Sequence, residues 1–345
     1  WGGVFLNKIV TLVTYKSPPN LRDFYSSPSI CITKDKMPQC VLLIIGESFS
    51  KSHSSLYGYD KNTNPNLSKL VLDTLLYVHN EVTAPALTTI KAFQAIMSTY
   101  RPEYGNEKNW YECTTLLEIM SLAGYKTTWI SNQSPSGMYD NIVAKYAELC
   151  DTTIWVGSKY KGIQKTDLDG EILNVLRPLS FKDGHQFVVI HLMGSHYDFR
   201  DRYPKSYEYF VDDDYLNVSK EQANVLAHYD NSILYNDYVV SEIFNYFADE
   251  EVIGFYLSDH GIDLFDSSNT YYGHARYDNA ISVQSASKVP FVVYSSALFK
   301  SHFPEEINDI ESLENEKYRS DELMDIIFDL IGIKVEGVND NSREE

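Results

Sequence analysis

Two short polar motifs follow directly after apolar runs of the sequence, and both carry side chains that bind metals. Glu47 comes after the run VLLIIG, and the adjacent pair Asp259 and His260 comes after the run VIGFYLS. Imidazole nitrogen and carboxylate oxygen are both zinc ligands, so one ion could be shared by the three side chains. Two simpler explanations stay open: a single glutamate here is often a helix N-terminal charge, and a single Asp-His pair is often a solvated loop.

A hydroxyl nucleophile that suits such a metal lies in the segment 82–98, VTAPALTTIKAFQAIMS. Thr88 and Thr89 stand where the helical part of this segment is expected to begin. A threonine hydroxyl is a weak nucleophile that coordination to a metal activates, and a helix N-terminus favours a phosphate group beside it. The simpler alternative is that these threonines cap the helix. The residues alone leave both threonines as candidates.

Three histidines lie close to the same motifs in the sequence. His191 and His196 begin and end HLMGSH after a third apolar run, and His274 stands in YYGHARY, downstream of SDHG. Each one alone would be an ordinary surface or core histidine. Their place beside the candidate ligands makes them candidates for proton transfer or for orienting a substrate. No such context surrounds the other five histidines, which are His53, His79, His185, His228 and His302.

Alternating strand and helix patterns explain how residues so far apart in the sequence can meet. Short apolar runs predict strands at 41–46, 125–131, 187–194, 252–258 and 289–295. Helical patterns predict helices at 86–98, 114–123, 221–248 and 320–331. Apolar strands separated by helices indicate an α/β fold with a mostly parallel central sheet and helices on both faces. Such sheets bind ligands beyond the carboxyl ends of their strands, where the candidate residues lie.

The composition is that of a folded, acidic protein. The 345 residues carry a formal net charge of −19, which argues against a nucleic-acid partner and against polybasic attachment to anionic membranes. No apolar run reaches the roughly 18 residues of a membrane-spanning helix. We expect a linker at 1–38, one catalytic domain at 39–335 and a polar tail at 336–345. Because the first residue is Trp1 rather than Met, we also expect a segment upstream of it.

Several motifs taken together resemble the phosphoethanolamine transferases, membrane-anchored enzymes of the alkaline phosphatase/sulfatase superfamily. These motifs are IIGESFSKSHSSLYGYDKNTNP (44–65), ALTT (86–89), HLMGSHYDFRDRYP (191–204), YDNSILYNDY (229–238), YLSDHG (256–261) and KVPFVVY (288–294). The resemblance implies an alkaline phosphatase/sulfatase-like fold. It implies transfer of phosphoethanolamine from phosphatidylethanolamine to lipid A or a lipopolysaccharide core sugar, through a phosphothreonine-type intermediate. It further implies a monomer at the bacterial inner membrane, anchored by an N-terminal membrane region, with its catalytic domain facing the periplasm.

The resemblance also implies a metal-ligand set. Glu47, Asp259 and His260 match zinc ligands of the family. Thr89 matches the residue that is both the fourth ligand and the nucleophile, because the family nucleophile lies nine residues before the serine that ends its helix motif, which is Ser98 here. One zinc ion is implied, and a second is left open.

Four further residues take roles from the resemblance. His196 matches a histidine assigned to catalysis. His191, His274 and Asn231 match positions expected to bind substrate. His196 and His274 could instead hold the second zinc ion.

Related activities remain as alternatives. A phosphodiesterase or sulfatase-like hydrolase would use water in place of the acceptor, and a glycerol-phosphate transferase of the same superfamily would use another donor. The sulfatase alternative is weakened because the Cys/Ser-x-Pro-Ser-Arg motif that yields formylglycine is missing. A non-catalytic domain that binds a lipid head group would not need the intact set of ligands and nucleophile.

The four cysteines include no CxxC pair, so they could form two disulfides or remain thiols. The exported location implied by the resemblance favours disulfides. We predict the pairs Cys31–Cys40, which closes a short loop, and Cys113–Cys150, which closes a longer one.

Overall fold

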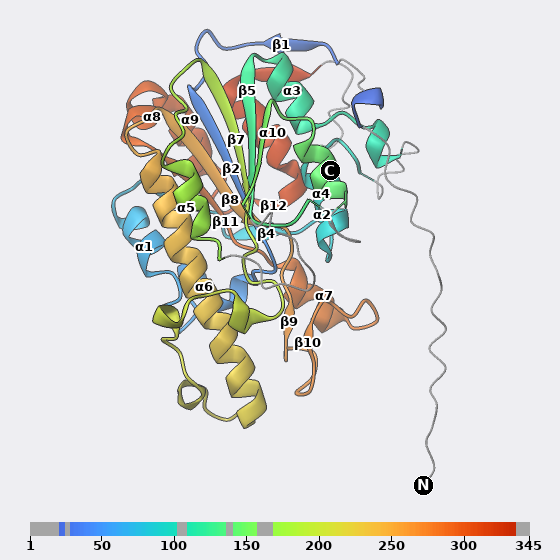
Figure 1. The fold of residues 1–345 in the computed structure, drawn as a ribbon, viewed down its shortest axis with the longest axis vertical. Coiled ribbons are helices and arrows are strands. Elements are labelled where there is room, and N and C mark those ends of the chain that lie inside the picture. The colour runs from blue at the N-terminus through green and yellow to red at the C-terminus, as the bar shows by residue number, and fades with distance from the viewer. Residues whose placement is uncertain (1–20, 25–27, 102–108, 136–140, 157–167, 336–345) are drawn as a thin grey trace.

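The computed structural model describes residues 21–24, 28–101, 109–135, 141–156 and 168–335. Figure 1 shows a central sheet with helices packed on both faces, which confirms the predicted α/β fold. Within these described ranges no helix combines the length and the apolar character needed to cross a membrane. The predicted tail at 336–345 and the first 20 residues of the predicted linker lie outside the described residues.

Seven strands form the central sheet in the order β3-β11-β8-β2-β7-β5-β6. Their bounds are β2 Cys40–Gly46, β3 Leu76–Val78, β5 Tyr125–Ser131, β6 Thr152–Trp155, β7 His185–His191, β8 Val252–Ser258 and β11 Phe291–Ser295. β2 runs parallel to β8 on one side and to β7 on the other, and β5 and β6 continue the parallel series. β11 is antiparallel to both β8 and β3, so the sheet is mixed at this edge.

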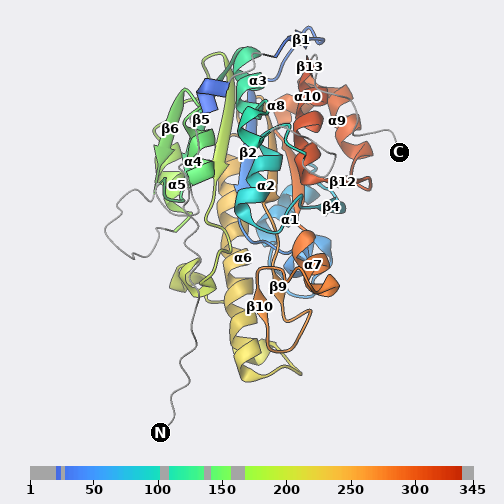
Figure 2. The same cartoon turned by 90° about the vertical axis from the view of Figure 1, so that its right-hand side faces the viewer.

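Helices cover both faces of the sheet, as the two views in Figures 1 and 2 show. Their bounds are α1 Pro65–Leu72, α2 Thr89–Ile96, α3 Leu116–Leu122, α4 Asn141–Ala147, α5 Glu171–Leu176, α6 Lys220–Tyr246, α7 Ala280–Ser287, α8 Ala297–His302, α9 Pro304–Ser312 and α10 Leu323–Ile331. Leu43 and Ile45 of β2 pack with α2, α3, α4 and α10, whereas Leu42 and Ile44 pack with α1, α5 and α6. Burial on both faces explains why β2 has no polar alternation.

Short strands outside the central sheet form three pairs. They are β1 (Ile30–Ile32) with β13 (Ile333–Val335), β4 (Glu81–Thr83) with β12 (Lys317–Arg319), and β9 (Asp263–Leu264) with β10 (Tyr272–Gly273). β1 lies within the predicted linker, and its backbone pairs with β13 near the end of the predicted domain. In Figure 1, β9, β10 and α7 lie below the central strands, beyond the carboxyl ends of β2 and β8.

The predicted helices are present with shifted ends. The helix predicted at 86–98 begins at Thr89, because Thr88 still has extended backbone angles. The helix predicted at 320–331 is a 3₁₀ turn at Ser320–Glu322 followed by α10. The strand predicted at 187–194 ends at His191.

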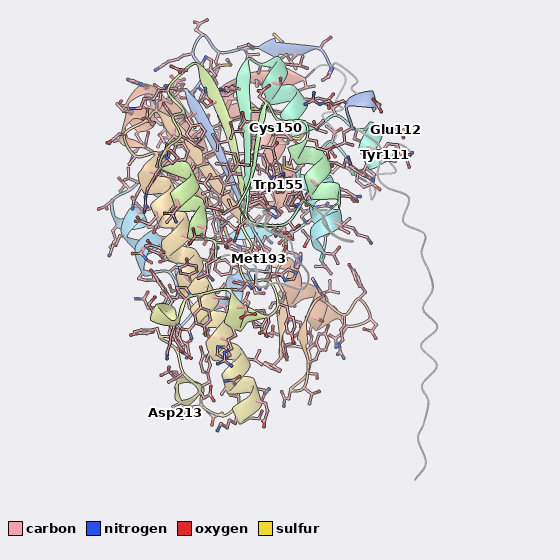
Figure 3. The ribbon with its side chains drawn as sticks, in the orientation of Figure 1. Tyr111, Glu112, Cys150, Trp155, Met193 and Asp213 are labelled. Atoms are coloured by element: carbon pink, nitrogen blue, oxygen red, sulfur yellow. The ribbon has the colours of Figure 1, made fainter. Side chains whose placement is uncertain are left out.

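All four cysteines are free thiols, so both predicted disulfides are wrong. Cys31 is exposed on β1, whereas Cys40 is fully buried at the start of β2. Cys113 directs its Sγ to the carbonyl oxygen of Asn109 at 3.5 Å. Cys150, labelled in Figure 3, packs in the apolar cluster that contains α4, and burial raises the pKa of its thiol to about 12. The lengths of the loops that the predicted disulfides would close do not show where in the fold each thiol lies.

Candidate metal centre

The register of two neighbouring strands brings the ligand motifs together. β2 and β8 are parallel, and Gly46 at the end of β2 lies opposite Ser258 at the end of β8. Glu47 and Asp259 are the next residues of each chain segment, so they leave the sheet side by side. A third element contributes Thr89, which is the first residue of α2. This helix packs on one face of the same sheet.

The side chains of Glu47, Asp259 and His260 form one compact cluster, which we call the metal cluster. One ligand atom from each lies within 4.8 Å of the others, and all three side chains are buried. His260 Nε2 lies 3.3 Å from Glu47 Oε1 and 3.6 Å from Asp259 Oδ2. Among the acidic, histidine and cysteine side chains of the described residues, these three have the spacing of a metal site.

The two buried carboxyl groups of the metal cluster favour a positive charge beside them. Burial raises the pKa of the Asp259 carboxyl, and the negative charge of Glu47 raises it further, to about 7. Burial also opposes the charge on Glu47, but its hydrogen bond to His260 and the histidine's charge hold the pKa of that carboxyl well below its usual range. Burial lowers the pKa of His260, yet Asp259 and Glu47 outweigh burial and raise it to about 10. A proton on His260 therefore balances the acids in this structure.

A zinc ion fits the donors of the metal cluster. Asp259 Oδ1 accepts hydrogen bonds from the backbone N–H groups of Ser48 (3.2 Å) and His260 (2.7 Å), but the buried Oδ2 accepts none. A buried carboxylate oxygen without a donor is costly unless a cation satisfies it. His260 Nδ1 lies 2.8 Å from the carbonyl oxygen of Gly261, and donation there leaves Nε2 as the ligand atom. Two carboxylates and one imidazole are a zinc-type donor set.

The hydroxyl of Thr89 reaches the metal cluster. Thr89 Oγ1 donates a hydrogen bond to Glu47 Oε2 at 2.9 Å and lies 3.4 Å from His260 Nε2. Thr89 is half-buried, so a substrate can approach it. Thr88 occupies the N-cap position of α2, although its side chain makes no capping hydrogen bond. Of the two threonines, Thr89 is the one whose hydroxyl contacts the candidate ligands.

Two of the predicted histidines lie near the metal cluster. The ring centroids of His274 and His260 are 5.1 Å apart. Burial lowers the pKa of His274, and the positive charge of His260 lowers it further. His196 is half-buried and close enough for its charge to help lower the pKa of Glu47. Its Nδ1 lies 2.6 Å from the carbonyl oxygen of Tyr197, which leaves Nε2 as the nitrogen that can exchange a proton.

His191 is the buried last residue of β7, beneath the surface that a substrate can reach. Its Nδ1 lies 3.2 Å from Ser131 Oγ, and its ring meets the Phe93 ring edge-on at 4.8 Å. Burial lowers the pKa of His191 to about 4, so the ring is neutral.

Asn231 is fully buried in α6 and bonds to a loop. Its amide oxygen accepts from the backbone N–H groups of Tyr209 (2.9 Å) and Phe210 (2.8 Å), and its amide nitrogen donates to the carbonyl oxygen of Phe210. These three bonds give Asn231 a part in shaping the loop, which differs from the direct substrate contact that we predicted.

Sequence reasoning missed Asp169, which holds the loop after β7. Asp169 Oδ1 and Oδ2 accept from the backbone N–H groups of Met193 and Gly194, each at 2.8 Å. Met193 lies beyond the end of β7 in Figure 3. Gly194 has φ +52°, and a Cβ at this residue would lie 2.7 Å from the backbone nitrogen of Glu47. The motif DLDG that contains Asp169 has no local signal for this role, because its partners lie 24 and 25 residues away.

Curated relatives of the chain are phosphoethanolamine transferases. The chain is 29% identical over 314 residues to phosphoethanolamine transferase EptC of Escherichia coli K12, covering 87% of this chain and 52% of that protein. It is 30% identical over 314 residues to CptA of Salmonella typhimurium, with the same coverage of 87% and 52%. It is 30% identical over 278 residues to EptA of Helicobacter pylori, covering 75% and 48%. The chain spans about half the length of these relatives.

Solved structures show the same fold. The C-terminal periplasmic domain of Escherichia coli EptC in complex with Zn has a TM-score of 0.79 at 24% identity, covering 90% of this chain and 87% of that one. The integral membrane protein EptA of Neisseria meningitidis has a TM-score of 0.72 at 22% identity, covering 89% and 57%. The curated relatives together with this shared fold confirm the resemblance to phosphoethanolamine transferases seen in the motifs.

The sequence profile named Sulfatase matches residues 39–333, which include every strand of the central sheet and the whole metal cluster. Profile, relatives and fold agree, and the chain belongs to the sulfatase family.

Proposed function

We propose that this chain is the catalytic part of a zinc-dependent phosphoethanolamine transferase. It takes the phosphoethanolamine group from phosphatidylethanolamine and passes it to lipid A or to a lipopolysaccharide core sugar. The names of its relatives support the transferred group. Two relatives at 22% and 23% identity are named Kdo(2)-lipid A phosphoethanolamine 7''-transferases, which supports an acceptor of this class.

The observation that carries the proposal is the position of the Thr89 hydroxyl. It lies 2.9 Å from Glu47 and 3.4 Å from His260, at the exposed side of a buried cluster that fits zinc. The N-cap position of α2 belongs to Thr88, so capping gives the Thr89 hydroxyl no role. Thr89 instead directs its hydroxyl to two candidate ligands.

The residues then have distinct roles. Glu47, Asp259, His260 and Thr89 would hold the zinc ion, which when bound lowers the pKa of a coordinated hydroxyl and offsets negative charge on a phosphoryl group. In the first step the proton of Thr89 Oγ1 passes to Glu47 Oε2, to which the hydroxyl already donates. Thr89 Oγ1 forms a bond to phosphorus, and the bond from phosphorus to the diacylglycerol oxygen breaks. Diacylglycerol leaves with a proton that His196 Nε2 donates in this proposal.

In the second step an acceptor oxygen forms a bond to the same phosphorus. The ester bond to Thr89 breaks, and Thr89 Oγ1 takes its proton back from Glu47 Oε2, which restores the hydroxyl. The proton lost by an acceptor hydroxyl returns to His196, so the histidine is ready for another turnover. His274, beside His260, would face the ethanolamine phosphate and help to orient it.

We place the enzyme at the bacterial inner membrane, with its catalytic domain on the periplasmic side. Its donor and its acceptor are both lipids of the cell envelope. Two proteins of similar structure support this location, since one is a periplasmic domain and the other an integral membrane protein.

The test is peptide mass spectrometry after the zinc-loaded protein has been incubated with phosphatidylethanolamine. We expect a phosphoethanolamine adduct on Thr89, and no adduct in the Thr89→Ala protein. Thr88→Ala is the matched control and should still form the adduct. An adduct on Thr88, or full turnover by Thr89→Ala, would overturn the proposal. Rapid release of free phosphoethanolamine without an acceptor would identify a hydrolase instead.

A further inference from the structure

Ser48 occupies an unusual position between the candidate ligands. It has φ +57°, a left-handed conformation that side chains other than glycine adopt rarely. Its three polar groups all bond within the site. The backbone N–H donates to Asp259 Oδ1 (3.2 Å), the hydroxyl donates to Glu47 Oε1 (2.6 Å), and the carbonyl accepts from the Tyr229 hydroxyl (2.8 Å).

Tyr229 fixes the backbone around Ser48. This tyrosine is fully buried in α6, and its ring is held edge-on between His53 and Phe199, with centroids 5.1 and 5.0 Å away. Its hydroxyl donates to the carbonyl of Ser48 and accepts from the backbone N–H of Ser50, both at 2.8 Å. One phenol group therefore spans the turn that follows Glu47 and keeps Ser48 in its left-handed conformation.

The hydroxyl of Ser48 determines how the Glu47 carboxylate is turned. With Oε1 held by Ser48, the other oxygen, Oε2, faces Thr89 at 2.9 Å. Rotation of the carboxylate would break both contacts together. The backbone N–H of Ser48 also contacts the second acid. Together with the backbone N–H of His260 it holds Asp259 Oδ1, and Oδ2 lies 3.6 Å from His260 Nε2.

We propose that Ser48 is a positioning residue for the metal centre and that Tyr229 holds it in place. Ser48 orients the two carboxylates so that one oxygen of each is presented to the ion, and it aligns Glu47 with Thr89. The inference rests on the zinc-dependent function proposed above and deepens it. The alternative is that Ser48 only forms a tight turn, for which glycine would serve at least as well.

Zinc binding separates these two explanations. Zinc affinity is measured by competition with a chelator, on protein whose fold is checked by circular dichroism. Ser48→Gly relieves the left-handed strain but removes the hydroxyl, and Ser48→Ala removes the hydroxyl alone. We expect both variants to bind zinc about ten- to a hundredfold more weakly, as is typical when a partner of a metal ligand is lost. Ser54→Ala, a buried serine bonded to Asn64, is the control and should bind normally.

Tyr229→Phe tests the second half of the inference. It should weaken zinc binding as well, whereas Tyr246→Phe should not, although that change also removes a bond from a tyrosine of α6 to a backbone carbonyl. In turnover assays Ser48→Gly should lower kcat and leave KM for the lipid donor near its normal value, because Ser48 acts on Glu47 and Thr89.

The outcomes distinguish this inference from the function on which it rests. If the unaltered protein binds zinc and Ser48→Gly binds it equally well, Ser48 is a turn residue and the inference is wrong. If Tyr229→Phe binds zinc normally while both serine variants are weakened, the part given to Tyr229 is wrong. If the unaltered protein binds no zinc, the proposed function fails with it. If Ser48→Gly does not fold, the result for Ser48→Ala decides.

Discussion

Two buried groups of acidic and histidine side chains each include a residue of the segment that follows β2, Glu47 in one and His53 in the other. They differ in whether the protein satisfies every carboxylate oxygen. The metal cluster leaves Asp259 Oδ2 without a hydrogen-bond donor. The second group, which we call the Asp230 network, consists of Asp230, His53, Tyr59 and Tyr215. Asp230 Oδ1 lies 2.7 Å from His53 Nδ1, and its Oδ2 accepts from the hydroxyls of Tyr59 (2.7 Å) and Tyr215 (2.5 Å).

The comparison shows that burial of an acid beside a histidine does not by itself identify a metal site. The protein supplies every donor that Asp230 needs, so the network holds α6 to two loops and leaves no oxygen for an ion. In the metal cluster two acids lie beside one histidine, and the chain supplies too few donors. In these two groups, a buried carboxylate oxygen without a hydrogen-bond donor is the feature that distinguishes the candidate metal site from the structural network.

Replacement of the unsatisfied acid should have the largest effect. Asp259→Asn keeps an oxygen for the two backbone donors and removes the charge that a cation needs. We expect zinc affinity to fall by more than about a hundredfold, with loss of transfer. Stability without zinc should not fall, because the repulsion between Asp259 and Glu47 is gone. Calorimetric titration with zinc and thermal unfolding measure both quantities. Retained zinc affinity would remove the main distinction between the two groups.

Zinc itself should stabilise the protein through the metal cluster. At a free concentration about a thousand times its Kd, a ligand that binds only the folded state adds about 4 kcal/mol to the free energy of unfolding. We expect a chelator to reverse this gain and the Asp259→Asn protein to show none of it. Denaturant titrations with and without zinc provide the measurement. An equal gain in the Asp259→Asn protein would place the ion elsewhere.

The same replacement in the Asp230 network should lower the stability of the protein and leave zinc binding unchanged. Asp230→Asn removes a charged acceptor from His53 and two tyrosines, and we expect a loss of about 2 kcal/mol in the free energy of unfolding. The gain on adding zinc should be unchanged. Asp213→Asn, an exposed change in the turn before α6 (Figure 3), should stay within about 0.5 kcal/mol. Weakened zinc binding in Asp230→Asn would show that the two groups are coupled.

The pH dependence of zinc binding should sharpen the comparison further. Protons and zinc compete for the same lone pairs. In the metal-free protein burial and Glu47 raise the pKa of Asp259 to about 7, and the two acids outweigh burial and raise the pKa of His260 to about 10. Zinc affinity should therefore rise with pH between 6 and 8, by about tenfold per pH unit for each proton displaced. Calorimetry in buffers of different ionisation enthalpy counts the protons. A slope of zero would contradict protonation of His260 in the metal-free state.

The sequence was sufficient to predict the parts of the site that follow a repeating pattern. Glu47 and Asp259 each come directly after a long apolar run, so their place at the end of a buried strand could be inferred without knowing which strands are neighbours. The choice of Thr89 depended on the family resemblance, because periodicity alone treats Thr88 and Thr89 alike.

Other features depend on pairings that have no local signal. The bonds of Asp230 to His53 and Tyr59 join residues 177 and 171 positions apart. The direction of β11 is equally hidden, because an apolar run looks the same in parallel and antiparallel sheets. The disulfide prediction failed for this reason too, since loop length does not show which thiols end in the core.

The position of β2 at the centre of the sheet has a consequence for the order of folding. As the chain is synthesised, residues 40–46 emerge long before their partners in β7 and β8, which lie at 186–191 and 252–258. Closing such long loops is slow, and until then a fully apolar strand has no neighbours and is prone to aggregate. Glu47 can meet Asp259 only after β8 has docked. Capture of an ion by both acids would therefore mark the end of folding, and zinc uptake could serve as a kinetic probe of that final step.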